Sequence, residues 1–305
     1  MKVDFVVVAC SRDLELLKLQ ARSIGRFLDP ELVNQIIVII NDPDPAFAGQ
    51  VYSIKKEYGP IQDCVVILDY TAVVGPSDLE FNGTYYSARN WESSQVARLL
   101  VSRIITTDWY INIDCKNIFT GPIDYSTFFV NEQAKVVGHV NTDDTIKNTE
   151  HSWWESSCKY FNFDGSLINP IRCYSPIVFR TQFVQHLISS NKNNTSLAYN
   201  LIDSLYTRSY PLADVSLYSA WVWNQNLYQS YYCNELIVRG SILEYGPDNP
   251  YCYIYEIHRL RDMSEILQNK EKQNITKQCL IEDTGLFTDA EWNNFLLSFE
   301  LEKTN

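Results

Sequence analysis

The sequence lacks the features typical of membrane-spanning proteins, of nucleic-acid-binding proteins and of small proteins held together by zinc or disulfides. No apolar run approaches the ~18 residues that cross a bilayer, which predicts that no segment spans a membrane. Basic residues are scarce: 25 Lys and Arg stand against 37 Asp and Glu, and the net charge of −12 argues against nucleic acid as a partner. The eight cysteines show no Cys-x-x-Cys or Cys-x-x-His spacing, so we expect neither a zinc site nor a disulfide framework.

Export signals and several enzyme motifs are missing as well. The apolar start of the chain is short and is interrupted by Asp4, so it does not fit a secretory signal. We therefore expect a cytoplasmic protein with reduced cysteines. The chain has no Gly-x-Gly-x-x-Gly, Walker loop, Gly-x-Ser-x-Gly or His-Glu-x-x-His. These absences count against a dehydrogenase, an ATPase, a serine hydrolase or a zinc protease.

What is present is a regular alternation of strands and helices in the first half of the chain. Apolar and β-branched runs predict strands at 3–9, 35–40, 64–68 and 109–113. Apolar residues at helical spacing predict helices at 14–27, 46–58 and 92–105. This alternation predicts an α/β fold with a mostly parallel central sheet and helices on both faces.

The second half is less regular. We expect strands at 134–139, 173–179 and 237–243, and helices at 181–190, 197–206, 214–222 and 263–272. Residues 141–164 are polar and aromatic, which favours a loop or lid. With no repeat and no linker, residues 1–305 form one predicted domain.

The most informative segment is 108–122. A short apolar strand runs into Asp114, and Gly121-Pro122 follows soon after. Carboxylates at the end of such a strand hold a metal or a ribose at the mouth of a parallel sheet, where open α/β folds bind ligands. The alternative is a strand-end Asp that caps the next turn.

Four segments together resemble a mainly bacterial family of glycosyltransferases with a GT-A-like fold. Residues 3–225 contain them in the family's order: Arg22-Ser23-Ile24 after the first strand, the helix that begins Trp91-Glu-Ser-Ser-Gln95 and continues to Arg98-Leu99, the 108–122 segment, and Ala213-Asp214-Val-Ser-Leu-Tyr218. The resemblance implies transfer of a sugar from a nucleotide-sugar donor to a glycan or lipid-linked acceptor, in polysaccharide assembly. It also implies a nucleotide-binding half, 1–125, and an acceptor-side half, 126–305.

The family's Asp-x-Asp reads Asp114-Cys115-Lys116 here. The resemblance implies that Asp114 holds the donor ribose or a Mg²⁺ or Mn²⁺ ion that bridges the diphosphate. Lys116 stands where the second acid would be. Its ammonium could replace the metal at the diphosphate, or it could pair with Asp114 and leave the site inactive. A solvated surface lysine is the third alternative. The metal requirement is therefore open.

Other donor-side candidates follow the first two predicted strands. In folds of this kind the loop after the first strand meets the nucleotide, and Ser11 and Arg12 supply suitable polar groups there. Ser11 could instead cap the next helix. Asp42, after the second strand, is a similar candidate, with a plain Asx-Pro turn as the alternative.

Three further candidates could contact phosphate or the donor. Gln95 and Arg98 are three residues apart on a predicted helix and so lie on one face; Arg98 keeps the charge of the family's Lys. His258 lies in a basic run with Arg259 and Arg261 that could bind phosphate. Surface positions are the alternative for Arg98 and His258.

Acceptor-side candidates come from the second half. Asp214 matches the family's Glu and could be the general base or an acceptor anchor, although it also suits a helix N-cap. Asp143, Asp144 and Glu155 are rivals for the base. Trp153 and Trp154 could stack on a sugar or could belong to the core.

Two other functions stay open. One is a degenerate glycosyltransferase that binds a nucleotide or glycan without turnover, because the Asp-Cys-Lys site could have lost its metal. The other is a sugar nucleotidyltransferase, which usually has a Gly-rich loop after the first strand, whereas residues 10–13 contain no glycine.

Overall fold

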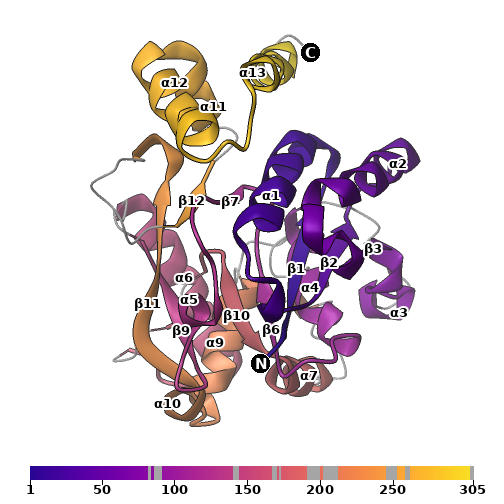
Figure 1. The fold of residues 1–305 in the computed structure, drawn as a ribbon. Helices are drawn as coiled ribbons and strands as arrows, with labels where there is room; N and C mark the ends of the chain where they lie inside the picture. Colours follow the sequence, from indigo (N-terminus) through magenta and orange to yellow (C-terminus); the bar gives the residue numbers. More distant parts are fainter. Residues whose placement is uncertain are drawn as a thin grey trace.

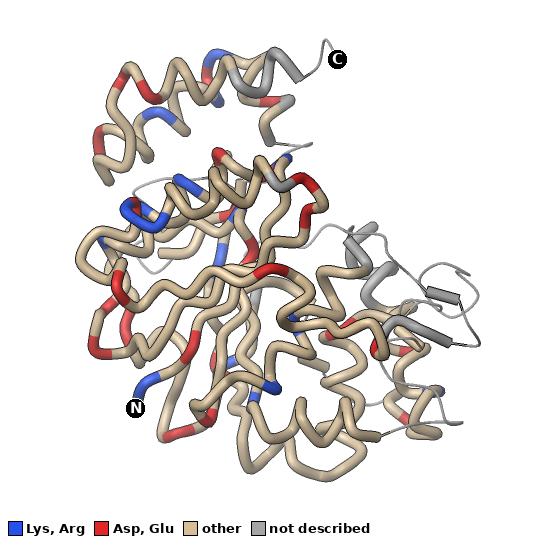
Figure 2. The backbone as a smooth tube through the Cα atoms, turned by 90° about the vertical axis from the view of Figure 1, so that its right-hand side faces the viewer, with Lys and Arg blue, Asp and Glu red and all other residues tan. Residues whose placement is uncertain are grey.

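The computed structural model describes residues 1–81, 84–85, 91–139, 144–166, 170–171, 173–190, 200–201, 212–244, 253–257 and 262–302. Within them the chain forms two five-stranded sheets with helices packed around them (Figure 1). Lys and Arg are interspersed with Asp and Glu along the backbone (Figure 2). No helix in these ranges is long and apolar enough to cross a bilayer.

The central sheet confirms the predicted α/β class. Its strand order is β10-β6-β1-β2-β3, in which β1, β2, β3 and β6 run parallel and β10 is antiparallel to β6. The strands span Val3–Ala9 (β1), Val33–Ile40 (β2), Val65–Asp69 (β3), Trp109–Asn112 (β6) and Ile177–Arg180 (β10). Nearly every residue of β1, β2 and β6 is buried, which explains their continuous apolar sequences.

Helices cover both faces of this sheet. In the strand order the chain moves from β1 through β2 to β3 in one direction and returns to β6 in the other; because such crossovers are right-handed as a rule, α1 and α2 lie on one face and α4 on the other. The α4 helix packs against α7 and α9. These helices span Leu14–Phe27 (α1), Pro45–Ile54 (α2), Trp91–Leu100 (α4), Thr181–Ser189 (α7) and Asp214–Asn224 (α9). The main apolar core lies between the sheet and these helices.

Short elements connect the main ones. They are α3 (Pro76–Leu79), β4 (Glu80–Phe81), β5 (Thr84–Tyr85), α5 (Tyr125–Phe128), α10 (Tyr228–Tyr231) and the 3₁₀ turns Ser11–Asp13, Pro30–Leu32, Lys55–Cys64, Tyr70–Ala72, Val101–Arg103 and Ile242–Glu244. The predicted helix over 46–58 therefore ends at Ile54 and continues as a 3₁₀ turn.

A second sheet was not predicted. Its order is β7-β12-β11-β9-β8, with β7 (Asn117–Phe119), β12 (Ile254–Glu256), β11 (Tyr232–Ser241), β9 (Gln133–His139) and β8 (Phe129–Val130). The sequence predicted β9 and part of β11. The other three strands are too short to carry a periodic signal. Because β7 directly follows the Asp114 turn, this sheet lies beside the candidate site.

The prediction of a loop or lid at 141–164 is wrong for most of that segment. Helix α6 spans Asp144–Tyr160. Trp154 and Cys158, one helical turn apart, are buried against Ala220 of α9. This packing outweighs the weak helix propensity of the Asn, Ser and Thr residues in the segment. The predicted helix at 197–206 lies outside the described residues apart from 200–201.

The C-terminal part adds three helices, α11 (Asp262–Gln268), α12 (Lys270–Lys277) and α13 (Asp289–Glu302), with a π-helical turn at Gln278–Asp283 (yellow in Figure 1). The single helix predicted over 263–272 is divided into α11 and α12. The division falls at Asn269, which caps α12 by accepting from the backbone N–H of Glu271 and Lys272. A second apolar cluster joins α11, the π-helical turn and α13 to Leu16 and Leu19 of α1.

Candidate active site at the end of β6

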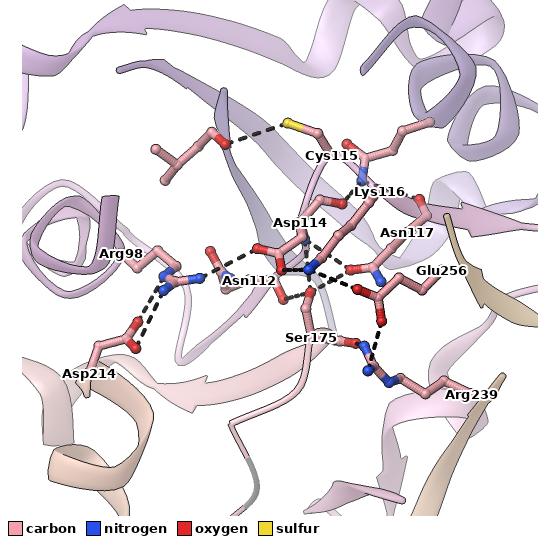
Figure 3. A network of polar contacts seen from close by, with 12 residues as sticks. Arg98, Asn112, Asp114, Cys115, Lys116, Asn117, Ser175, Asp214, Arg239 and Glu256 are labelled. Atoms are coloured by element: carbon pink, nitrogen blue, oxygen red, sulfur yellow. Dashed lines mark hydrogen bonds and ion pairs between the residues drawn. The ribbon is translucent and has the colours of Figure 1, made fainter. Parts of the chain in front are cut away.

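The candidate site is built on a tight turn directly after β6. The backbone N–H of Asn117 donates to the carbonyl oxygen of Asp114 (2.9 Å), which closes the turn 114–117. The N–H of Asp114 donates to the side-chain oxygens of Asn117 (2.9 Å) and Ser175 (2.8 Å). The turn therefore lies at the carboxyl edge of the parallel strands, where the sequence placed Asp114, and its backbone is held by buried polar groups (Figure 3).

Lys116 lies between two carboxylates. Its Nζ is 2.7 Å from Oε1 of Glu256 on β12 and 3.6 Å from Oδ2 of Asp114. Burial alone would lower the pKa of Lys116, but the carboxylates of Glu256 and Asp114 raise it above its ordinary value. About a third of the side chain is exposed (32%). Lys116 is thus a charged residue in an ion-pair network rather than a solvated surface lysine.

Glu256 is itself held by a second base. Its Oε2 lies 2.8 Å from Nη2 of Arg239 on β11, and Arg239 also donates to the carbonyl oxygen of Ser175 (2.8 Å). The guanidinium of Arg239 lies over the ring of Tyr174, 4.6 Å from its centroid. Arg239 and Glu256 are both nearly buried, so their pairing compensates the cost of removing either charge from water.

Arg98 makes the corresponding contacts on the other side of Asp114. Its Nε lies 2.8 Å from Oδ2 of Asp214, and its Nη1 lies 3.4 Å from Oδ1 of Asp114. Burial would lower the pKa of Arg98, but the carboxylates of Asp214 and Asp114 raise it. Burial raises the pKa of Asp214, and the charge of Arg98 opposes that shift.

These contacts form one chain of alternating charge across the site: Asp214, Arg98, Asp114, Lys116, Glu256 and Arg239. Three acidic and three basic groups balance formally. This series of six charged side chains connects α9 and α4, which cover the central sheet, to the turn after β6 and then to two strands of the second sheet. Asp114 is its central member because each of its oxygens faces a different base.

The α4 helix places Gln95 and Arg98 on one face, as the spacing predicts, and both contact Asp214. The side-chain oxygen of Gln95 accepts from the backbone N–H of Asp214 (3.0 Å). Asp214 is 2% exposed and is the first residue of α9, whose N-cap is Ala213, so the predicted N-cap alternative for Asp214 is wrong by one position. Because Asp214 is buried and paired with Arg98, its carboxylate is placed to hold the Arg98 guanidinium. A general base must instead reach an acceptor hydroxyl, which this buried position does not favour.

The loops after β1 and β2 meet beside the site. The backbone N–H of Ser11 donates to Oδ2 of Asp42 (2.8 Å), and Oδ1 of Asp42 accepts from the N–H of Asp44 (2.9 Å). Ser11 begins a 3₁₀ turn and caps no helix by its side chain. Ser11 and Arg12 are exposed. Asp42 thus forms the predicted Asx turn and also joins the two loops.

The aromatic candidates divide. Trp154 is 6% exposed, packs on Phe163 and donates from its indole N–H to the carbonyl of Gly165 (3.1 Å), which is the environment of a core residue. Trp153 is partly exposed.

The remaining candidates are acids and a histidine. Glu155 is exposed on α6, and its Oε1 lies 3.3 Å from Nε2 of His151. Asp144 is the first residue of α6. His258 and Asp143 lie outside the described residues.

The described residues fit a divalent metal poorly. Among them no three His, Cys, Asp or Glu side chains gather as a ligand set. Asp114 is the one acid on the turn, and its carboxylate is already shared between Arg98 and Lys116. A divalent ion there would have to displace or tolerate two neighbouring cations.

Three residues of the site were not predicted from the sequence: Glu256, Arg239 and Ser175. Glu256 belongs to a three-residue strand, and nothing in its neighbourhood distinguishes it from a surface acid. Arg239 lies in the segment 237–243 that was predicted as a strand, and the one available signal was a charged residue within an otherwise largely apolar strand, because arginine is rarely buried without a partner.

The sequence from residue 1 to 258 matches the profile of a family of unknown function, DUF6492. The chain belongs to that family. No curated protein matches it by sequence. Its structure resembles that of galactosyltransferase LgtC in complex with donor and acceptor sugar analogues, with a TM-score of 0.50 at 11% identity over 96% of this chain and 99% of that one.

Two further solved structures match with lower TM-scores. The bifunctional glycosyltransferase WbbM has a TM-score of 0.45 at 13% identity, over 72% of this chain and 37% of that one. Mouse xyloside xylosyltransferase 1 has a TM-score of 0.43 at 11% identity, over 85% and 98%. The fold of this DUF6492 protein is therefore that of the GT-A glycosyltransferases, as the likeness to LgtC shows.

Proposed function

We propose that this protein transfers a sugar from a nucleotide-sugar donor to a glycan or lipid-linked acceptor, in polysaccharide assembly. The observation that carries the proposal is the charged turn 114–117 at the carboxyl edge of the central sheet of a GT-A-like fold. Ligands of open α/β sheets bind at that edge. In this proposal the donor diphosphate lies against the turn, and the loops that Ser11 and Asp42 join contact the nucleoside.

Lys116 supplies positive charge at the departing diphosphate in this proposal. When the bond between the sugar and the diphosphate breaks, the negative charge that develops on the leaving oxygen needs a fixed cation. The Lys116 ammonium has three N–H donors, and within the described residues Glu256 and Asp114 are its two partners. One donor is then left for a phosphate oxygen. We further propose that the reaction needs no divalent ion.

The charge balance of the site indicates where more cations are needed. The six-membered network is formally neutral, so the diphosphate would bring uncompensated negative charge. Arg12, exposed in the loop after β1, and the basic run that contains His258 are the groups that we propose to offset it. Within the network, Arg98 serves to hold the Asp114 carboxylate in place.

The acceptor side follows from the same geometry. The acceptor oxygen forms the new bond to the sugar, and its proton passes to a carboxylate or to the leaving diphosphate. Because Asp214 is buried and paired, the exposed Glu155 is the better candidate for contact with the acceptor, together with the partly exposed Trp153. In this proposal residues 1–125 are the nucleotide-binding half and 126–305 the acceptor-side half, except that the basic run containing His258 acts on the donor diphosphate.

The test is thermal denaturation of the full chain with UDP-, GDP-, CMP- and dTDP-sugars, each with Mn²⁺ and with EDTA, followed by detection of released sugar. We expect one nucleotide class to stabilise the protein equally in EDTA. Stabilisation that requires Mn²⁺ would contradict metal independence and would assign Asp114 to the metal. No stabilisation by any donor would contradict the transferase proposal.

One observation favours a second candidate, a nucleotide- or glycan-binding protein without turnover. Lys116 is engaged by two carboxylates, and such pairing could leave too little charge for a leaving group. A nucleotide that binds while no nucleotide sugar releases its sugar, with or without Mn²⁺, would support this candidate over the enzyme.

A further inference from the structure

Helix α1 contacts the Asp114 turn from behind through a buried amide. The side-chain N–H₂ of Gln20 donates to the carbonyl oxygen of Asp114 and to that of Asn117 (3.2 Å), the first and last residues of the turn. Gln20 is fully buried. Ser23, one helical turn later, accepts from the backbone N–H of Phe119 (3.1 Å). Two polar side chains of α1 therefore hold the chain from the turn into β7.

The helix that carries Gln20 is firmly placed. On α1, Leu17, Ala21 and Ile24 are buried in the main core, while Leu16 and Leu19 are buried in the second cluster under the C-terminal helices. A helix packed on both sides cannot shift without disturbing both clusters. The packing of α1 therefore fixes the position of Gln20, and the hydrogen bonds of Gln20 fix the position of the turn.

The opposite side of the turn is held by Ser175. Its hydroxyl accepts from the N–H of Asp114 (2.8 Å) and donates to the side-chain oxygen of Asn117. The direction in which Asp114 and Lys116 project depends on the backbone of this turn. If the turn moves, the two side chains move together, and the spacing of the charged network changes with them.

We infer that Gln20 is a positioning residue for Asp114 and Lys116. An amide N–H₂ has two donors and can serve two carbonyls at once, which a hydroxyl with one donor cannot do. Loss of these donors would leave the Asn117 carbonyl without its side-chain partner and would weaken the connection between helix and turn. The consequence for donor binding rests on the proposed function; the consequence for the turn itself does not.

The test compares Gln20→Met with Gln185→Met in the full chain. Methionine is close to glutamine in length and has no donor. Gln185 is the matched control because its side chain also donates to a backbone carbonyl, that of Ser102 (2.7 Å), away from the site. The first measurement is hydrogen exchange of the backbone amides at 114–119. We expect faster exchange there in Gln20→Met, and exchange like that of the wild type in Gln185→Met.

The second measurement is calorimetric binding of UDP, GDP, CMP and dTDP. We expect Gln20→Met to bind the nucleotide that the wild type selects about tenfold more weakly, which corresponds to about 1.4 kcal/mol. Gln185→Met should bind it normally. In a Lys116→Met background, Gln20→Met should add little, because a residue that acts through Lys116 shows non-additive effects.

The outcomes separate the two proposals. Unchanged exchange at 114–119 in Gln20→Met would overturn the positioning inference, as would equal weakening by Gln185→Met. If no nucleotide binds the wild type, the proposed function fails, and the exchange measurement alone decides whether Gln20 holds the turn.

Discussion

The ammonium of Lys116 lies 2.7 Å from the carboxylate of Glu256, although the two residues come from distant parts of the chain. The pairing of β12 with β7, in which Glu256 is opposite Asn117, brings them together. The Glu256 carboxylate therefore offsets part of the positive charge of the Lys116 ammonium, which we propose to contact the donor diphosphate.

Glu256→Gln should strengthen nucleoside diphosphate binding, by about threefold to tenfold. The substitution removes a negative charge beside the site and frees Lys116 and Arg239 to attract an anion. The measurement is calorimetric affinity in EDTA at low and high salt. Glu235→Gln is the control, because Glu235 pairs with Lys135 on the same sheet (3.4 Å) and should leave affinity unchanged. Weaker binding in Glu256→Gln would contradict this expectation.

Asp214→Asn should destabilise the protein by about 3 kcal/mol, because it removes the closer counter-ion of the buried Arg98. Urea denaturation measures the change. The matched control is Asp108→Asn, which removes the exposed partner of Arg180 (3.2 Å) and should cost less than about 1 kcal/mol. Equal losses would show that the buried pair contributes no more than an exposed one.

Cys10 should alkylate slowly at neutral pH. Burial and the neighbouring Asp13 carboxylate raise its pKa from 9.0 to about 11, and its thiol donates to Asp13 (3.2 Å). Because the thiolate is the nucleophile and a raised pKa keeps the thiol protonated, labelling should be slow at pH 7, should rise about tenfold per pH unit and should level off only near pH 11. Iodoacetamide rates from pH 7 to 11, followed by peptide mass spectrometry, measure this. Asp13→Asn should shift the profile to lower pH; fast labelling at pH 8 in the wild type would contradict the prediction.

Trp154→Ala should cost about 3–5 kcal/mol of unfolding free energy, because the indole fills the core between α6 and α9. Trp153→Ala, at the adjacent and partly exposed position, should cost much less. Urea denaturation of both variants compares them. A small loss for Trp154→Ala would place its ring outside the core and return it to the list of sugar-stacking candidates.

The sequence predicted the central sheet because β1, β2 and β6 are buried on both faces and so carry continuous apolar runs. It missed the second sheet because β7 and β12 are three residues long, too short for any periodic pattern. It was wrong about α6, where contacts made only in the folded protein outweigh local preference.

For the site, sequence spacing correctly placed Gln95 and Arg98 on one face and Asp114 at a strand end, because each of these depends on local geometry. The partners Glu256 and Arg239 depend on the pairing of distant strands, which no local pattern encodes. The resemblance to glycosyltransferases aligned Asp214 with a functional position. The structure adds that Asp214 is buried against Arg98, a contact that a single sequence does not reveal.

The most direct test of the central claim is sugar release from the selected nucleotide sugar by the wild type, Lys116→Met and Lys135→Met, all in EDTA. Melting temperatures should first establish that each variant is folded. The wild type and Lys135→Met should turn over the donor, whereas Lys116→Met should lose turnover while it stays folded. Full turnover by folded Lys116→Met would contradict the role of the lysine as the cation at the leaving diphosphate.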